Sequence, residues 1–310
     1  MSESAYLPMN FGGIAEERFS GYDAARILIW PVSYEGTVSY GAGTGRGAAA
    51  IIEASRNMEL YDEETDAEVY RLGIHTLDPS PPLDPPERMM QSLLERAREL
   101  TATGKLIVMI GGEHSVSAPV IQAHAEKYPD LSVLQIDAHA DLRETYDGTP
   151  HSHASIMARV TRDLRLPVVQ CGIRSISAEE ARALSSLPTR IFWAKDIVGR
   201  QDWWEKAVAG LTENVYLTID IDGLDPSLVP QTGTPEPGGL GWYEVMGLIR
   251  TLARRRRVVG MDLVEYSYVE GQTASAFLCA KLIYKSLSFI FEAQTERVRG
   301  GDRQMPATSV

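Results

Sequence analysis

The chain has 310 residues, of which 44% are hydrophobic and 23% are charged, and its formal net charge is −12. This composition is typical of a soluble globular protein, and the length suits a single α/β domain. The acidic balance argues against nucleic acid or an anionic membrane surface as a partner, and it suits a cationic substrate.

Predicted strands alternate with predicted helices along almost the whole chain. In chain order they are strand 26–32, helix 47–61, helix 86–103, strand 105–110, helix 116–127, strand 131–137, strand 166–173, helix 178–186, strand 190–194, helix 202–210, strand 214–222, helix 242–255, strand 256–266 and helix 273–292. Such alternation is typical of an α/β protein whose parallel sheet is covered by helices on both faces.

No domain boundary interrupts this alternation. The proline-rich stretch 77–90 fits a rigid surface connection that leads into a helix better than it fits a linker. We therefore expect a single domain over residues 1–310, with a core from about 25 to 292 and a flexible polar tail from about 297 to 310.

The cysteines and the N-terminus bear on the compartment. Cys171 and Cys279 are too few for a disulfide framework and lack the spacing of a metal site. The first ten residues show no basic-then-apolar leader, and no run approaches the ~18 unbroken apolar residues of a membrane span. We therefore expect a cytoplasmic protein.

Acidic and histidine side chains gather where four of the predicted strands end. They are His114, Asp137, His139, Asp141, Asp220, Asp222 and Glu265. The carboxyl ends of parallel strands meet at one edge of the sheet, where ligands bind. Because residues i and i+2 of a strand face the same side, we expect Asp220 and Asp222 to point together, and the chain to curl at 138–140 to bring Asp141 back.

Carboxylates that converge at a buried edge are costly unless a cation accompanies them. Two divalent cations would balance four aspartates, and oxygen-rich ligation with a minority of imidazole suits Mn²⁺ better than structural zinc. The pattern therefore predicts a two-metal site. An isolated histidine such as His75 or His124 is instead interpreted as a core residue.

Five motifs in this order resemble the ureohydrolases, the family of arginase, agmatinase and formiminoglutamase. They are GGEHS (111–115), DAHAD (137–141), TIDIDGLDP (218–226), TGTPEPGG (232–239) and DLVEYS (262–267). The resemblance covers residues from about 25 to 290, and ASRNMELYD (54–62) is closer to agmatinase than to arginase. It implies an α/β/α sandwich with a mostly parallel eight-stranded sheet, two Mn²⁺ ions per chain and hydrolysis of a guanidinium group to urea.

The resemblance also implies six metal ligands. His114 and Asp141 would bind one ion, and His139 and Asp222 would bind the other. Asp137 and Asp220 would bind both.

The resemblance also implies catalytic residues. One is the predicted metal ligand Asp141, and the others do not bind metal. Glu265 would accept the guanidinium N–H groups in a bidentate fork, and Thr234 would orient Glu265. The leaving amine needs a proton, for which an imidazole is the natural carrier. We expect His153 to carry it and to contact the substrate, whereas His151 lines the entrance or is simply solvated.

The expected reaction is the conversion of agmatine to putrescine and urea. The loop 146–152 carries Asp147 and no Lys or Arg, which favours a second amine over a zwitterion, and Arg143 is expected nearer the metal strand. Aminopropyl-agmatine, guanidinobutyrate, arginine and formiminoglutamate stay open as substrates. Tyr268 stands where many relatives have proline, and the loop 143–152 is not typical of arginase, so loop shape and substrate size are open too.

Two alternatives belong to other classes of protein. A metal-dependent deacetylase shares the fold but generally uses one zinc ion and fewer carboxylates. A non-catalytic, metal-stabilised scaffold would be favoured by loss of a ligand or of the proton carrier, and the sequence shows no such loss. The resemblance further implies a homo-trimer or homo-hexamer, in which Trp203, Trp204 and Phe291 form either a subunit contact or the core.

Overall fold

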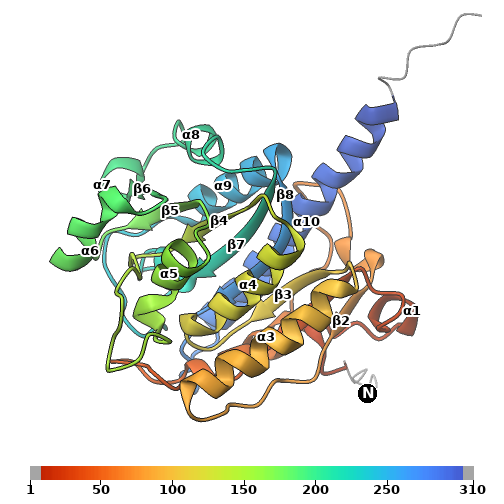
Figure 1. The fold of residues 1–310 in the computed structure, drawn as a ribbon. Coiled ribbons are helices and arrows are strands. Elements are labelled where there is room, and N and C mark those ends of the chain that lie inside the picture. The colour runs from red at the N-terminus through yellow and green to blue at the C-terminus, as the bar shows by residue number, and fades with distance from the viewer. Residues whose placement is uncertain (1–7, 303–310) are drawn as a thin grey trace, which may run out of the picture.

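The computed structural model describes residues 8–302, and these form one eight-stranded sheet in which every pair of neighbouring strands is parallel (Figure 1). The strands are β1 (Ile27–Pro31), β2 (Ile74–Thr76), β3 (Leu106–Ile110), β4 (Leu131–Ile136), β5 (Val168–Ile173), β6 (Thr189–Trp193), β7 (Asn214–Asp220) and β8 (Arg257–Val264). Their order across the sheet is β2-β1-β3-β8-β7-β4-β5-β6. The four strands β3, β8, β7 and β4 therefore lie side by side in the middle.

Helices cover both faces of the sheet and complete the predicted α/β/α sandwich (Figure 1). One face carries α3 (Pro86–Ala102), α4 (Ser117–Lys127) and α5 (Ile156–Ala158), which a π-helical stretch (Arg159–Asp163) continues. The other face carries α2 (Gly47–Ser55), α8 (Trp204–Val208), α9 (Trp242–Arg255) and α10 (Ala274–Asp302). The remaining short α-helices are α1 (Glu17–Ser20), α6 (Ala178–Ala183) and α7 (Ala194–Ile197). Single 3₁₀ turns span Phe11–Gly13, Thr44–Arg46, Val69–Leu72, His114–Val116, His153–Ser155, Leu184–Ser186 and Ile221–Gly223.

The apolar pattern of each element explains its place. All six residues of β4 are buried, as expected for a parallel strand that is covered on both faces. In α9 the buried residues Val245, Leu248, Ile249 and Leu252 recur at the spacing of one helix face. The Glu244 carboxylate accepts the Gly241 N–H (2.7 Å) and so caps the start of that helix.

The structure corrects several predicted boundaries. Strand β2 was missed because three residues on the sheet edge are too few to show a period. The helix predicted for 47–61 ends at Ser55. The strand predicted for 214–222 ends at Asp220, where the chain turns into a 3₁₀ segment.

The last helix overlaps the start of the predicted polar tail. Helix α10 continues to Asp302, and Figure 1 shows its last turns standing out from the body of the protein. The Arg297 guanidinium donates to the carbonyls of Ala253 (2.9 Å) and Arg256 (2.6 Å), which ties this part of α10 to the end of α9. Residues 297–302 are therefore helical, and residues 303–310 lie outside the described residues.

Helix α10 is part of the hydrophobic core. Its segment Ala274–Thr295 is long and apolar enough to span a membrane, with a mean hydropathy of 1.4, but 78% of the apolar window is buried inside the protein. The side chains of Phe291 and Trp203 are only 6% and 3% exposed. Of the residues considered for a subunit contact, these two are therefore core residues of this chain.

Buried His124 on α4 gives a test of the fold in solution. Its ring packs edge-on against Tyr216, and its Nδ1 lies 2.8 Å from the Val120 carbonyl oxygen. Burial lowers the pKa of His124 to about 4, so the folded protein keeps this imidazole neutral. The unfolded chain takes up a proton near its ordinary pKa of about 6.5, so this contribution to stability is complete above that pH and is lost as the pH falls toward 4.

We expect the wild type to lose about 3 kcal/mol more unfolding free energy than His124→Gln between pH 7 and pH 4. Urea unfolding of the two proteins in metal-free buffer measures the difference, because release of metal then contributes to neither. Identical pH dependence in the two proteins would contradict a neutral, buried His124.

Candidate metal centre and catalytic pocket

The four middle strands of the sheet carry the acidic and histidine residues to one edge. His114 follows β3, Glu265 follows β8, Asp220 is the last residue of β7, and Asp137 directly follows β4. His139, Asp141 and Asp222 follow in the same loops. All six predicted metal ligands and Glu265 therefore meet at the carboxyl ends of adjacent strands, as the rule for open parallel sheets requires.

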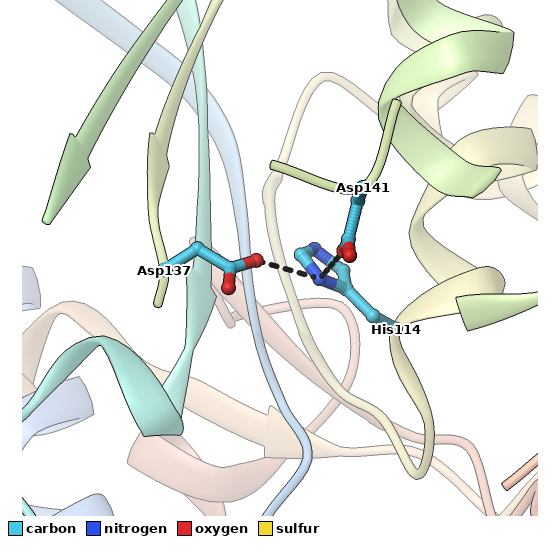
Figure 2. Close-up of side chains that lie close together, drawn as sticks. All are labelled: His114, Asp137 and Asp141. Atoms are coloured by element: carbon cyan, nitrogen blue, oxygen red, sulfur yellow. Dashed lines mark ion pairs between the residues drawn. The ribbon is translucent and has the colours of Figure 1, made fainter. Parts of the chain in front are cut away.

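Three carboxylates surround one nitrogen of His114. Its Nδ1 lies 3.2 Å from Asp137 Oδ2, 3.1 Å from Asp141 Oδ2 and 3.4 Å from Asp220 Oδ2. Figure 2 shows the ring of His114 between the Asp137 and Asp141 carboxylates. Among the described residues this buried Nδ1 has no hydrogen-bond partner of good geometry.

The other nitrogen of His114 shows where a cation can bind. Its Nε2 lies 2.9 Å from Thr218 Oγ1, and the Thr218 hydroxyl donates to Asp262 Oδ1 (2.6 Å). The hydroxyl has only one proton, so the Thr218 oxygen must accept from Nε2–H. Although burial lowers it, the pKa of His114 is held well above its ordinary value by the Asp137, Asp141 and Asp220 carboxylates, so a proton occupies Nδ1 when no cation is bound. With Nε2–H donated to Thr218, Nδ1 is the nitrogen that a cation can take over from that proton, as in a metal ligand held by a carboxylate beyond it.

A second group lies beside the first. His139 Nδ1 is 2.9 Å from Asp222 Oδ2 and 3.8 Å from Asp137 Oδ1. The ligand atoms of Asp137, His139 and Asp222 lie within 4.8 Å of one another, as do those of His114, Asp137 and Asp141. Asp137 belongs to both groups, which is the geometry of a shared ligand.

Tight turns bring these carboxylates together. The expectation that they converge because residues i and i+2 of a strand face the same side is therefore wrong. The Asp220 carboxylate accepts the backbone N–H of Asp222 (2.9 Å), and that of Asp137 accepts the N–H of His139 (2.6 Å). The expected curl at 138–140 is followed by Asp141 with a φ of 53°. This left-handed conformation, unusual for a residue other than glycine, turns its carboxylate back to His114.

The negative charge of the buried carboxylates is not balanced unless a cation binds. Burial and the neighbouring Asp141 and Asp222 carboxylates raise the pKa of Asp137 to about 7. Burial and the neighbouring Asp222 also raise the pKa of Asp220 well above its ordinary range. The cluster offers four carboxylates and two imidazoles, one of which has a nitrogen without a hydrogen-bond partner among the described residues. This oxygen-rich donor set fits two divalent cations.

The pKa values of the predicted ligands His139 and Asp222 shift in opposite directions. Although burial lowers it, the pKa of His139 rises to about 10 because the Asp222 carboxylate accepts from it. The same contact lowers the pKa of Asp222 to about 2 against the effect of burial. A cation that displaces the His139 proton would therefore take over an existing charge pair.

Sequence analysis missed four polar residues that hold the ligands. Gln135 donates to Asp137 Oδ2 (2.5 Å) and accepts from Gln170 (2.6 Å), while Thr218 and Asp262 support His114. Each is a buried polar residue inside a mostly apolar strand. That contrast was visible in the sequence, because a polar side chain in a fully buried strand needs a partner.

A cavity of about 290 Å³ opens above the ligands. Glu265, Thr234 and His153 line it together with five of the predicted metal ligands, His114, His139, Asp141, Asp220 and Asp222. Glu265 has a φ of 63°, and its Oε1 accepts the backbone N–H of His114 (2.6 Å). Burial and the neighbouring Glu113 raise the pKa of Glu265 to about 8. In residues 8–302 no hydrogen bond joins Thr234 to Glu265, so the His114 backbone orients Glu265 instead.

The two candidate proton carriers lie apart. His153 lines the cavity, with the Tyr146 ring 5.6 Å away in an edge-on arrangement. His151 lines a separate hollow of about 250 Å³ beside α3 and α4 with Met90 and Arg159. Only His153 of the two faces the predicted metal ligands.

The expected lining of the distal end needs correction. Of the loop 146–152, only Tyr146 lines the cavity, and Asp147 does not. Arg143, expected nearer the metal strand, does line it, with its Nε 3.9 Å from the Glu180 carboxylate. The sequence could not predict which side chains after β4 face the cavity, because the left-handed conformation of Asp141 changes the direction of the chain there.

Comparisons with known proteins agree with this geometry. The sequence model of the arginase family matches residues 25–288. The chain is 37% identical to the N(1)-aminopropylagmatine ureohydrolase of Synechocystis, over 92% of this chain and 95% of that protein. It is 37% identical to an agmatinase of Bacillus anthracis, over 80% of this chain and 86% of that protein. The solved agmatine ureohydrolase of Thermoplasma volcanium superimposes with a TM-score of 0.84, at 26% identity over 94% and 98%.

Proposed function

The chain belongs to the arginase family and is an amidinohydrolase, and we propose that it hydrolyses agmatine to putrescine and urea with two Mn²⁺ ions bound. The observation that carries the proposal is the unpartnered Nδ1 of His114. It faces three carboxylates in the cavity that Glu265 and His153 also line. A second substrate, N(1)-aminopropylagmatine, is favoured by the similarity to the Synechocystis enzyme over 92% of this chain.

The six predicted ligands are the residues that would hold the ions. His114 with Asp141 and His139 with Asp222 would each bind one, and Asp137 and Asp220 would contact both. Two divalent cations bound there lower the pKa of water and so supply a nucleophile near neutral pH. Oxygen-rich ligation with two imidazoles supports Mn²⁺ as the metal.

Glu265 would bind and orient the guanidinium group. Its carboxylate is 8% exposed and lines the cavity beside Asp220 and His114. A planar cation that donates two parallel N–H groups matches a carboxylate in a bidentate fork. Pairing with that cation also offsets the burial that raises the pKa of Glu265 to about 8, so the substrate stabilises the ionised form that binds it.

His153 would donate the proton that the departing amine needs. Attack on the guanidinium carbon gives a tetrahedral species, and its C–N bond breaks readily only when the amine nitrogen is protonated. An imidazole can give that proton and regain one from water.

The alternatives from other classes lose their basis. The family match over residues 25–288 argues against a deacetylase, and the complete set of converging ligands argues against a non-catalytic scaffold. Both cysteines are free and buried, which suits the cytoplasmic location that we propose.

Urea release from a panel of guanidino compounds tests the substrate. With Mn²⁺ added, we expect kcat/KM for agmatine to exceed that for arginine by about 100-fold or more. The α-carboxylate of arginine would enter a cavity lined by Glu180 and Glu265. Among the described residues that line it, Arg143 is the one basic side chain besides the histidines, and it already lies 3.9 Å from Glu180.

Other outcomes of the same panel separate the candidates. Equal rates on agmatine and arginine would contradict selection against the carboxylate. A preference for N(1)-aminopropylagmatine would keep the mechanism and replace the substrate, and a preference for guanidinobutyrate would mean that Arg143 binds the distal carboxylate.

A further inference from the structure

Glu113 is a buried carboxylate in the GGEHS motif that the mechanism above does not use. Its side chain is 0% exposed, and four donors occupy its two oxygens. Oε2 accepts the backbone N–H groups of Gly36 (2.7 Å) and Thr37 (2.6 Å), and Oε1 accepts the hydroxyls of Thr37 and Ser115 (both 2.6 Å). None of these donors is a predicted metal ligand, so Glu113 has another role than its neighbour His114.

Thr37 connects Glu113 to His153. Its Oγ1 accepts the backbone N–H of His153 (3.2 Å) and lies 3.4 Å from His153 Nδ1. The single hydroxyl proton of Thr37 is already donated to Glu113. The Thr37 oxygen can therefore only accept from Nδ1, so Nδ1 carries a hydrogen in this contact.

The other ring nitrogen then becomes the reactive one. His153 Nε2 lies 3.5 Å from Ser39 Oγ, and both residues line the cavity. With a hydrogen on Nδ1, Nε2 is the nitrogen that gains and loses a proton on the cavity side. Ser152 Oγ also lies 3.4 Å from Nδ1, and a donation from Ser152 would require the opposite tautomer.

The loop that carries Thr37 is held at both ends. Glu113 holds Gly36 and Thr37, and the Glu35 carboxylate accepts the N–H groups of Gly43 (3.0 Å) and Gly45 (2.8 Å). Residues 38–40 between these anchors line the cavity. The contact from Thr37 to His153 is thus in place before a substrate binds, which limits the reorganisation needed during proton transfer.

We propose that Glu113 and Thr37 form a hydrogen-bonded relay that fixes the tautomer and orientation of His153 for proton transfer from Nε2. Glu113 and Thr37 are positioning residues, since neither lines the cavity. The inference rests on the proposed function, in which His153 protonates the leaving amine.

Thr37→Val tests the relay because it removes the hydroxyl and keeps the shape of the side chain. We expect kcat to fall about 10- to 100-fold, the size of loss known for partners that orient metal-binding imidazoles, with KM within about twofold and metal content at the wild-type level. The pH profile of kcat should also differ from that of the wild type, because the imidazolium loses its acceptor chain. Thr37→Ser restores the hydroxyl and should recover most of kcat.

Three further variants complete the test. Thr161→Val removes a buried hydroxyl that donates to the Met157 carbonyl outside the cavity, and it should leave kcat and its pH profile unchanged. Glu113→Gln turns an acceptor toward the Gly36 and Thr37 N–H groups into an amide with its own donors, and should lower kcat at least as much as Thr37→Val. Ser152→Ala should have the smaller effect if Thr37 sets the tautomer.

The relay is overturned if an active wild type and Thr37→Val share the same kcat and pH profile, or if Ser152→Ala alone shifts that profile. A wild type that releases no urea from any guanidino compound would overturn the proposed function and the relay together.

Discussion

Asp220→Ala is expected to reduce urea release to the background rate and to lower the bound metal from two ions per chain to one or none. The Asp220 carboxylate lies 3.4 Å from the unpartnered Nδ1 of His114, and its Oδ1 accepts the backbone N–H of Asp222, the ligand two residues on. Removing it would take away a carboxylate that is proposed to hold both ions, and it frees the turn that positions Asp222. Both losses act on the nucleophile, so the effect should be the largest of any single substitution.

Metal analysis after manganese reconstitution, together with the rate of urea release, measures both effects. Asp225→Ala is the matched control, because Asp225 lies in the same loop but accepts the N–H groups of Ser227 (3.0 Å), Gly238 (3.0 Å) and Gly239 (3.0 Å). It should cost stability and keep both ions. An Asp220→Ala protein that holds two manganese ions and keeps a substantial rate would remove Asp220 from the site.

Much of the architecture was predictable from the sequence, because burial on both faces gives parallel strands a continuous apolar pattern. Strands β4 and β7 showed such a pattern, and the polar residues at their ends stood out against it. The convergence of the ligands followed from one rule about parallel sheets. The exact turns did not, since Asp141 has its left-handed conformation where its carbonyl accepts the N–H groups of Met157 and Ala158, which lie well along the chain.

Contacts between distant segments were out of reach of the sequence pattern. Thr37 meets Glu113 across 76 positions and His153 across 116 positions, and neither Gly36 nor Thr37 belongs to a periodic element. A loop of this kind has no hydrophobic period to read. The same limit explains the misplacement of Arg143, which lines the cavity two residues after the left-handed residue Asp141.

His153→Ala should keep both metal ions and lose about 10²- to 10⁴-fold in kcat, the usual contribution of a general acid–base residue. His153 belongs to neither group of metal ligands, and it lines the cavity with Glu265. Its loss would leave the proposed nucleophile and the proposed guanidinium-binding carboxylate of Glu265 in place, but the amine would have to depart without a proton donor. Added imidazole should restore part of the rate, because the substitution leaves room beside Ser39 and Thr37 for a small ring.

His151→Ala is the matched control for this prediction, since it removes the same side chain two residues earlier in the same loop. His151 lies in the separate hollow beside α3 and α4, so its loss should change kcat by less than about threefold. A dead His151→Ala protein with an active His153→Ala protein would make His151 the proton carrier. Loss of metal from His153→Ala would instead mean that its imidazole supports the metal centre, and the relay through Thr37 would then serve metal binding rather than proton transfer.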